Sequence, residues 1–426
     1  MIVDDQIYKG FWWLPSSPDD QIAGTLTIEP NGKAYLELLG AFRVSNELEA
    51  VFERRYAPVI YGRCYAPNSY MKNITLIDCH SATKLNFSSS FPITRFSSRF
   101  ALIGIHIDSM DNASFFKTHV DFKELAFWCP PKNISTMLSD DSISIRINTS
   151  IDDAAPLTTI RLDNGCTLNL RETATYKPDY PALYISQGTF LEILKDEMTG
   201  YQVLSINRIF ELFLSVATLS SIEHGKITLY SKQVYQEVGD KIYYHPIELV
   251  TYLFKNNSQE SIKSYDYLFK FKDIADVFMV MFKRIYTNKS IVQILCNLID
   301  SFEKKRVYSS NDFLVVAQAL DGFSIRFRKE KGFLPQLTEL RNEFRDISRL
   351  SLTDDDLKAA TGSRHYYSHI LRSEIKEAKN AIDGLELYEL TKKLRVLLIC
   401  CVLNFMGMNN EKINHLLNQC NNIILR

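Results

Sequence analysis

The spacing of the hydrophobic residues changes part-way along this chain of 426 residues, and that change constrains its fold more than any other feature. Up to about residue 180, short runs rich in β-branched and aromatic residues are separated by turn residues such as Pro30-Asn31-Gly32 and Asp163-Asn164-Gly165. Several of these runs alternate apolar and polar side chains, which is typical of β-strands. Beyond about residue 265 the apolar residues recur every three or four positions, which predicts amphipathic helices.

The β-rich half contains many short predicted strands, and this number favours a sandwich or barrel-like domain. The clearest strands are Gly24–Ile28, Ala34–Leu39, Asn73–Asp78, Ala101–Ile107 and Ser142–Ile147. A segment of helical length follows over about residues 201–221. Two more predicted strands lie around Ile227–Tyr230 and Lys241–Tyr244.

The helical half begins after the polar stretch Lys255–Ser264, which is the best candidate for a linker. Its predicted helices cover Phe269–Ile285, Ile291–Phe302, Phe313–Phe327 and Leu385–Met406. We therefore expect an α+β protein. A β-rich, sandwich-like domain would cover residues 1–258, and an all-α helical bundle would cover residues 265–426.

Charge divides at the same place as the hydrophobic spacing. The whole chain has 49 Lys and Arg against 50 Asp and Glu, a net charge of −1, which argues against a protein that coats nucleic acid over its whole surface. Residues 259–426 hold 26 of the basic and 21 of the acidic residues, so their net charge is +5 and that of residues 1–258 is −6. A mildly basic helical half permits contact with nucleic acid but does not require it.

The cysteines and the apolar segments predict a cytoplasmic protein without membrane contact. The eight cysteines include no CxxC pair and repeat no spacing, so we expect free buried thiols and neither a disulfide nor a metal site. The first residues are acidic, and no apolar run with a small-residue cleavage site follows them, so we expect no secretory signal. The apolar stretch Leu394–Met408 contains Arg395 and is shorter than the roughly 20 residues that span a bilayer, which favours a buried helix.

Residues 360–370 (ATGSRHYYSHI) carry the most informative chemistry. Gly362 is expected to end one helix, and Ser363 to cap a second helix that begins at Arg364. Arg364 and His369 would then lie about 140° apart around the helix and about 7.5 Å apart along it. A histidine can take the proton of an RNA 2′-hydroxyl near neutral pH, and an arginine can hold the phosphate oxygens through paired hydrogen bonds. Because only RNA carries that internal nucleophile, the pair suits RNA cleavage.

Other interpretations of this region remain open. An Arg and a His at this spacing also arise by chance on a solvated helix face, with Tyr366 and Tyr367 as packing residues. Upstream, three arginines recur every four residues and predict a basic stripe along one side of a helix, which could follow a phosphate backbone. These are Arg341, Arg345 and Arg349. Pairing with neighbouring acidic residues is the alternative.

The segment resembles the signature of HEPN-domain ribonucleases, which is an Arg, a polar residue, three further residues and a His in a small helical bundle. His365 stands at the polar position, where Asn is common in that family. The segment Gln318–Phe323 resembles the position at which many such proteins carry an acidic residue beside the Arg and His. The resemblance therefore makes Asp321 a candidate for orienting Arg364 or fixing a histidine tautomer.

Segments of the β-rich half resemble the amino-terminal domain of the ApeA family. They are Gly10–Pro15, Ala23–Ile28, Leu38–Phe42, Ile60–Gly62, Ile74–Cys79 and Phe122–Trp128. ApeA-like proteins are bacterial anti-phage factors that act by abortive infection. The resemblance thus implies a toxin-like, conditional and metal-independent endoribonuclease, with transfer RNA a reasonable target and a phage-derived trigger of unknown identity. Residues 1–258 would sense that trigger and gate the nuclease.

The resulting hypothesis assigns roles to named residues and needs no cofactor. His369 is the general base, or the acid for the leaving 5′-oxygen, and Arg364 stabilises the phosphorane, with help from His365 and Asp321. Contacts with the RNA are expected from Arg341, Arg345, Arg349 and Tyr366. We expect a homodimer, since one protomer offers one Arg–His pair. Two alternatives remain: a catalytically silent HEPN module that binds nucleotide or RNA, and an unrelated interaction protein with a chance motif.

Overall fold

The computed structural model describes residues 5–42, 56–65, 70–81, 93–132, 134–139, 142–147, 155–252, 266–303, 310–329, 331–369 and 379–421. The chain forms two compact units. The first contains residues 1–126, 131–207 and 223–259, and the second contains residues 127–130, 208–222 and 260–426. The predicted linker Lys255–Ser264 lies outside the described residues.

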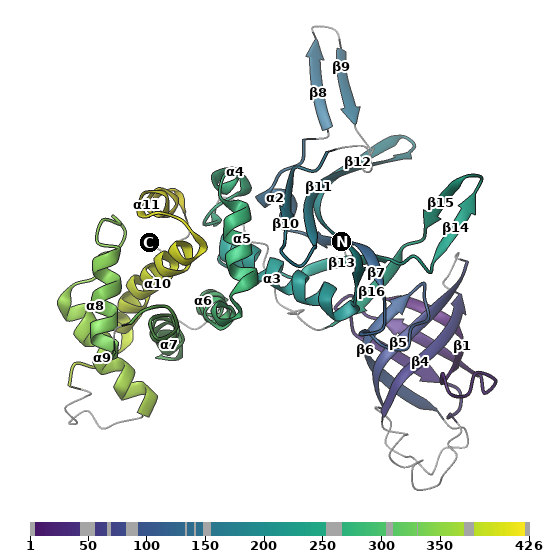
Figure 1. Cartoon of the computed structure of the whole chain (residues 1–426), viewed down its shortest axis with the longest axis horizontal. Coiled ribbons are helices and arrows are strands. Elements are labelled where there is room, and N and C mark those ends of the chain that lie inside the picture. Colours follow the sequence, from purple (N-terminus) through teal and green to yellow (C-terminus); the bar gives the residue numbers. More distant parts are fainter. Residues whose placement is uncertain are drawn as a thin grey trace. The chain divides into compact units, whose positions relative to one another are not determined.

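Six strands of the first unit close into a barrel (Figure 1). They are β1 (Gln6–Trp13), β2 (Ile22–Ile28), β3 (Ala34–Leu38), β4 (Tyr56–Tyr65), β5 (Met71–Ser81) and β6 (Thr94–Ile103). They pair antiparallel in the order β6-β3-β2-β1-β4-β5, and β5 pairs again with β6, which leaves no free edge in the ring. All six strands contribute apolar side chains to one buried core. Trp12 lies opposite Gly62 in this core, and its ring occupies the space that a side chain at Gly62 would need.

Strand β6 also pairs with β16 and so extends the sheet beyond the barrel. The further strands, in spatial order, are β16 (Ile247–Thr251), β13 (His224–Tyr230), β7 (Phe115–Phe122), β12 (Ala182–Met198), β11 (Thr167–Asp179) and β10 (Thr158–Arg161). Two hairpins form separate sheets, β8 (Ile134–Ser139) with β9 (Ser142–Ile147) and β14 (Tyr235–Val238) with β15 (Lys241–Tyr244). The predicted β-rich half is confirmed, and it combines a barrel with sheets.

A cluster of polar and charged side chains connects three strands of this sheet. Arg171 Nε and Asn169 Nδ2 donate hydrogen bonds of 2.6 and 2.8 Å to Glu192 Oε2, and His119 Nε2 lies 3.5 Å from Glu192 Oε1. Burial alone would raise the pKa of the Glu192 carboxyl, but the hydrogen bonds from His119, Asn169 and Arg171 outweigh it and lower the pKa from 4.5 to about 2. Together these side chains join β7, β11 and β12.

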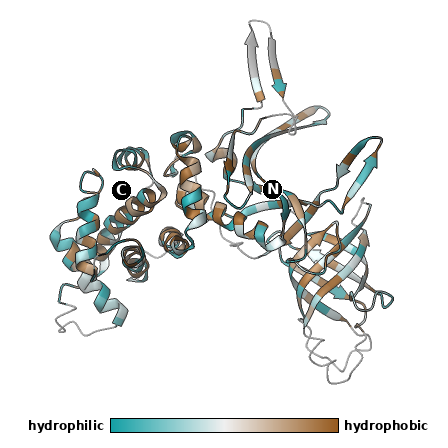
Figure 2. Cartoon of the chain, in the orientation of Figure 1, coloured by the Kyte–Doolittle hydropathy of each residue, from teal (hydrophilic) through white to brown (hydrophobic). Residues whose placement is uncertain are grey.

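The second unit is helical, as predicted. Its main helices are α5 (Phe278–Thr287), α6 (Val292–Glu303), α7 (Ser310–Phe327), α8 (Phe333–Glu343), α9 (Asp354–His369), α10 (Gly384–Met406) and α11 (Asn410–Gln419). Shorter elements are α4 (Phe271–Ile274) and η2 (Lys289–Ile291). The unit also includes Phe127 and Trp128, the last two residues of α2 (Leu125–Trp128), and the second half of α3 (Gly200–Thr218). Figure 2 shows many hydrophilic residues along α8 and α9.

An aromatic cluster explains one difference from the sequence prediction. The predicted helix over 269–285 is interrupted, because α4 ends at Ile274 and α5 begins at Phe278. In a continuous helix Phe271 and Phe278 would lie about 10 Å apart along the axis. The break instead brings their rings to 5.6 Å, and each also contacts the buried ring of Trp128.

The long helix α10 is the centre of the second unit. All residues from 394 to 403 are buried, including Arg395, whose guanidinium lies over the ring of Phe302 at 5.5 Å. This confirms the prediction of a buried helix for the apolar stretch. Within the described residues, no helix is long and apolar enough to cross a membrane. The eight cysteines are free thiols, and all except Cys296 are buried.

Candidate active site

Helix α9 carries the Arg–His motif and runs without a break from Asp354 to His369. The prediction that Gly362 ends one helix and Ser363 caps another is therefore wrong. The helix begins at Asp354, and its first turn carries three aspartates, which suit the positive end of the helix dipole. There, Thr353 Oγ1 accepts the N–H of Asp356 at 3.1 Å, and the Asp356 carboxylate accepts the N–H of Thr353 at 2.8 Å.

Gly362 and Ser363 are small because another segment packs against them. A Cβ atom on Gly362 would lie 2.8 Å from the carbonyl carbon of Asn380. Ser363 Oγ accepts the N–H of Ile382 at 3.0 Å, and Tyr367 Oη donates to the carbonyl of the same residue at 3.0 Å. Burial and the nearby Asp383 raise the pKa of Tyr367, which keeps its hydroxyl protonated as a donor. We call Ser363, Tyr367 and Ile382 the α9 clamp.

Arg364 is held by two other helices. Its Nη2 donates to Asp321 Oδ2 on α7 at 2.6 Å, and its guanidinium carbon lies 4.8 Å from the ring centre of Phe333, the first residue of α8. Both charged side chains keep part of their surface in solvent, 28% for Arg364 and 19% for Asp321. Among the described residues, Nε and Nη1 of Arg364 have no acceptor, so they can bind an anion.

His365 and His369 lie one helical turn apart and stack loosely. Their ring centroids are 6.3 Å apart with planes inclined by 23°. His369 is exposed and His365 is partly exposed. The structure therefore brings Arg364 and Asp321 together and places both histidines at the surface of the same helix.

The predicted basic stripe does not form on one helix, because α8 ends at Glu343. The buried side chains of Phe344 and Ile347 turn the chain into the core, and Arg345 and Arg349 lie beyond the helix. Arg341 Nη1 binds Asp354 at 2.6 Å, and this lowers the pKa of the Asp354 carboxyl.

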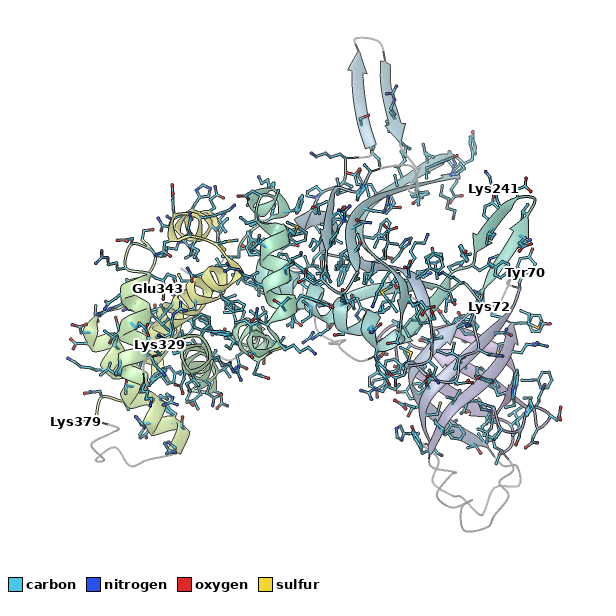
Figure 3. All side chains as sticks on the ribbon, viewed as in Figure 1. Tyr70, Lys72, Lys241, Lys329, Glu343 and Lys379 are labelled. Carbon is cyan, nitrogen blue, oxygen red and sulfur yellow. The ribbon has the colours of Figure 1, made fainter. Side chains whose placement is uncertain are left out.

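The other residues predicted to contact RNA do not form one cluster. Arg345 is exposed, 3.8 Å from Asp346, and the half-buried Arg349 has an Nη1 without a partner among the described residues. Tyr366 packs edge-to-face on Tyr367 at 4.9 Å. Glu343, labelled in Figure 3, pairs with Arg328 at 2.8 Å rather than with the stripe. RNA contact by these residues stays a prediction.

Sequence reasoning missed Phe333 and the α9 clamp. No local pattern marks Phe333, since its role depends on the packing of α8 beside α9. Gly362 and Ser363 were noticed for their residue types, but their partners Asn380 and Ile382 lie about 20 residues along the chain. The small residue types of Gly362 and Ser363, directly before Arg364, were the available signal of close packing.

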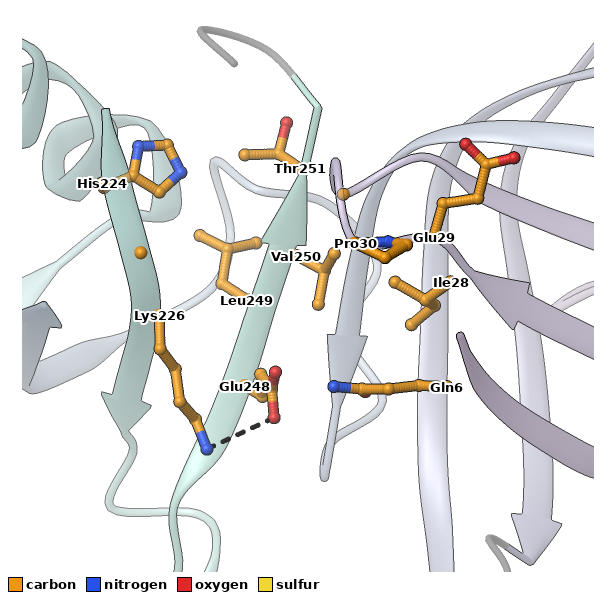
Figure 4. A pocket seen from close by; sticks show the side chains of 12 residues that line it. Gln6, Ile28, Glu29, Pro30, His224, Lys226, Glu248, Leu249, Val250 and Thr251 are labelled. Atoms are coloured by element: carbon orange, nitrogen blue, oxygen red, sulfur yellow. Dashed lines mark ion pairs between the residues drawn. The ribbon is translucent and has the colours of Figure 1, made fainter. Parts of the chain in front are cut away.

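Described residues of the first unit line two cavities. A cavity of about 420 Å³ opens at one end of the barrel and is lined mainly by apolar side chains, including Leu14, Phe42 and Phe96, with Asp108 at its edge. A smaller one of about 90 Å³ lies between β13, β16 and the β2–β3 turn, where Lys226 and Glu248 are 3.5 Å apart (Figure 4). The larger volume suits a small-molecule site. Among the described residues no group of three or more His, Cys, Asp or Glu is placed to hold a metal ion.

The ApeA N-terminal domain 1 family matches residues 7–284, which is more than half of the chain, and the Apea-like HEPN family matches residues 295–412. The chain belongs to the ApeA family. Searches of curated proteins and of solved structures give no significant match.

In this ApeA-family chain, the Arg–His motif lies within the residues that the HEPN family matches. Arg364, His369 and Asp321 all lie within residues 295–412, on helices of the second unit. The combination of an ApeA amino-terminal domain and an HEPN domain indicates a family of anti-phage nucleases.

Proposed function

We propose that this ApeA-family protein is a conditional endoribonuclease whose catalytic groups lie on α9. One observation carries the proposal. Arg364 is fixed by Asp321 and Phe333 but keeps free N–H groups, while His369 is exposed on the same helix. A guanidinium held in place and a histidine open to solvent are groups that can catalyse metal-free cleavage of RNA.

The proposed reaction uses the RNA's own 2′-hydroxyl as nucleophile. His369 takes the 2′-hydroxyl proton, or protonates the leaving 5′-oxygen, and Arg364 stabilises the negative charge on the phosphorane. Asp321 orients Arg364, and His365 lies beside His369. The products carry a 2′,3′-cyclic phosphate and a 5′-hydroxyl. We expect further RNA contacts from Arg341, Arg345, Arg349 and Tyr366, and transfer RNA is the proposed target.

A homodimer and a gate complete the proposal. Two facing copies of α9 would surround one phosphate with two Arg–His pairs. Residues 1–258, the predicted regulatory domain, would restrain the nuclease until a phage-derived trigger binds. The barrel cavity of about 420 Å³ supports a sensing role, because a pocket of this size can accept a ligand.

Phage-infected bacteria that carry the full-length protein test the proposal. Protection from phage, growth arrest and RNA integrity are compared for the wild type and for Arg364→Ala, His369→Ala and His415→Ala. His415 is the matched control, because it is an exposed histidine on α11 of the same unit. We expect RNA cleavage and protection with the wild type and His415→Ala and neither with the other two variants.

Two results would contradict the nuclease. One is full protection and cleavage by Arg364→Ala and His369→Ala at wild-type protein levels. The other is equal RNA binding by the wild type and the Arg364→Ala/His369→Ala double variant with no cleavage by either, which would support the catalytically silent binding module instead.

A further inference from the structure

We infer that His365 and His369 of one protomer form the acid–base pair of the proposed cleavage, so that a single helix supplies both proton transfers. The inference rests on the proposed nuclease function and goes beyond it, because it makes His365 a second titrating group. It also gives each copy of α9 a complete set of groups for proton transfer.

Helix α9 packs through one face and carries its two histidines on the opposite face. Ser363 and Tyr367 are four residues apart and share the stripe bound to Ile382. His365 and His369 are also four residues apart and lie about 200° away from that stripe, on the other side of the helix. The α9 clamp therefore fixes the rotation of the helix that leaves both imidazoles facing outward.

Both imidazoles are available for proton exchange. Neither His365 nor His369 forms a hydrogen bond with any described residue, and both keep exposed surface. Two histidines in the first unit differ. His106 Nε2 is bonded to the carbonyl of Gly62 at 2.9 Å, and His119 lies 3.5 Å from Glu192.

The separation of the two rings suits a phosphodiester that lies along their outer edges, because the ring planes are inclined by only 23° and the ring nitrogens donate and accept in the plane of each ring. At a centroid distance of 6.3 Å, each imidazole can reach one of the two apical oxygens of a phosphorane over a hydrogen bond of about 2.6–3.2 Å. Arg364 lies about 100° from His365 and about 140° from His369 around the helix, on the flank between the histidines and the packed stripe. Its free Nε and Nη1 can then hold the non-bridging oxygens.

The chemical step balances with these two groups alone. The neutral imidazole takes the 2′-hydroxyl proton as the 2′-oxygen forms its bond to phosphorus. The protonated imidazole gives its proton to the 5′-oxygen as the phosphorus–5′-oxygen bond breaks. The base ends protonated and the acid neutral, and exchange of one proton through water restores the pair.

A substrate with a different leaving group can show which histidine acts as the general acid and which as the general base. Cleavage sites are first mapped with natural RNA, and a synthetic RNA of one site is then made with sulfur in place of the bridging 5′-oxygen. A thiolate leaves without a proton, so loss of the general acid does not slow this substrate, whereas loss of the base slows both substrates. Full-length wild type, His365→Asn, His369→Ala and His415→Ala are purified from infected and uninfected cells and assayed on both RNAs.

The expected result has three parts. His365→Asn and His369→Ala each slow natural RNA by about 10²–10⁴-fold. The sulfur substrate restores one of these two variants to near the wild-type rate and does not restore the other. The bell-shaped pH profile of the wild type loses one limb in each variant, and His415→Ala matches the wild type throughout.

Failure of this inference is distinguishable from failure of the proposed function. If His365→Asn cleaves natural RNA at the wild-type rate with both limbs of its pH profile, the paired role is wrong and the nuclease stands. The paired role is also wrong if sulfur restores both variants or neither. If the wild type cleaves neither RNA, both the nuclease and the pair are wrong.

Discussion

Each unit of this protein holds an arginine–carboxylate pair close to histidine, and the two pairs differ in what else they bind. Arg171 and Glu192 in the first unit are 2.6 Å apart, and Glu192 is 5% exposed and also bound by Asn169. Arg364 and Asp321 in the second unit are equally close but more exposed, and their neighbouring histidines have no hydrogen bond among the described residues. The same ion pair thus joins strands in one unit and leaves an open site in the other.

This difference shows that burial distinguishes an ion pair that stabilises the fold from one that can take part in a binding or catalytic site. A carboxylate whose oxygens accept several internal donors has little capacity left for a ligand, and its loss damages the fold. A pair at the surface adds little stability but fixes the direction of a guanidinium. The predictions below separate these two roles, from the largest expected effect to the smallest.

Replacing Glu192 by Ala should destabilise the protein by about 3–5 kcal/mol, because Arg171 would remain largely buried without its partner. Replacing Asp321 by Asn should cost about 1 kcal/mol or less, and should lower RNA cleavage instead. Urea unfolding and a cleavage assay on both variants measure the contrast. Equal losses of stability would remove the distinction between the two pairs.

Acid should weaken the first unit through the same carboxyl. Because the pKa of Glu192 falls from 4.5 to about 2 on folding, its charged form stabilises the protein fully above pH 4.5. That contribution, about 3 kcal/mol, is lost as the pH falls from 4.5 through 2. The stability difference between the wild type and Glu192→Gln should therefore shrink over this range. A difference that stays constant from pH 5 to pH 2 would contradict the assigned pKa.

Two helical glycines give a matched test of packing around α9. Gly362→Ala should destabilise the protein by about 1–3 kcal/mol, since the new methyl group meets the backbone of Asn380. Gly322→Ala on α7 has no atom within 4 Å and should stabilise it by up to about 1 kcal/mol through helix propensity. Thermal unfolding of both variants measures the two changes in stability. Stabilisation by Gly362→Ala would show that the segment at Asn380 does not pack against Gly362.

The α9 clamp should contribute a smaller amount. Tyr367→Phe removes the hydrogen bond to the Ile382 carbonyl and should cost about 1 kcal/mol. Tyr366→Phe removes a hydroxyl that has no hydrogen bond to the described residues and should leave stability unchanged. The difference in unfolding midpoint between the two variants is the measurement, and its absence would contradict the clamp.

Local signals predicted much of the fold. Pro30-Asn31-Gly32 forms the expected turn, with Gly32 at φ +83° and Asn31 Oδ1 accepting the N–H of Lys33. Asp163-Asn164-Gly165 does the same with Gly165 at φ +81°. Closure of the barrel was not predictable in this way, because the β5–β6 pairing depends on the path of the whole sheet.

For the candidate site, too, local sequence signals predicted some features and missed those that depend on tertiary packing. The Arg–His pair was predicted from residue types and spacing, whereas Asp321 became a candidate only through the resemblance to HEPN ribonucleases, and it does lie beside Arg364. The helix break at Gly362 was wrong, because a glycine that ends a helix and one that admits a neighbouring backbone look alike in sequence. The arginine stripe was wrong because Phe344 and Ile347, not the arginines, decide where α8 ends.

The chemical ends of RNA cut during infection test the central claim most directly. Our account predicts 2′,3′-cyclic phosphate and 5′-hydroxyl ends that accumulate at defined sites in cells with the wild type and with His415→Ala. These ends should be absent with His369→Ala and with Arg364→Ala. The same ends at the same sites with His369→Ala, or ends that carry 5′-phosphate in the wild type, would contradict a nuclease built on α9.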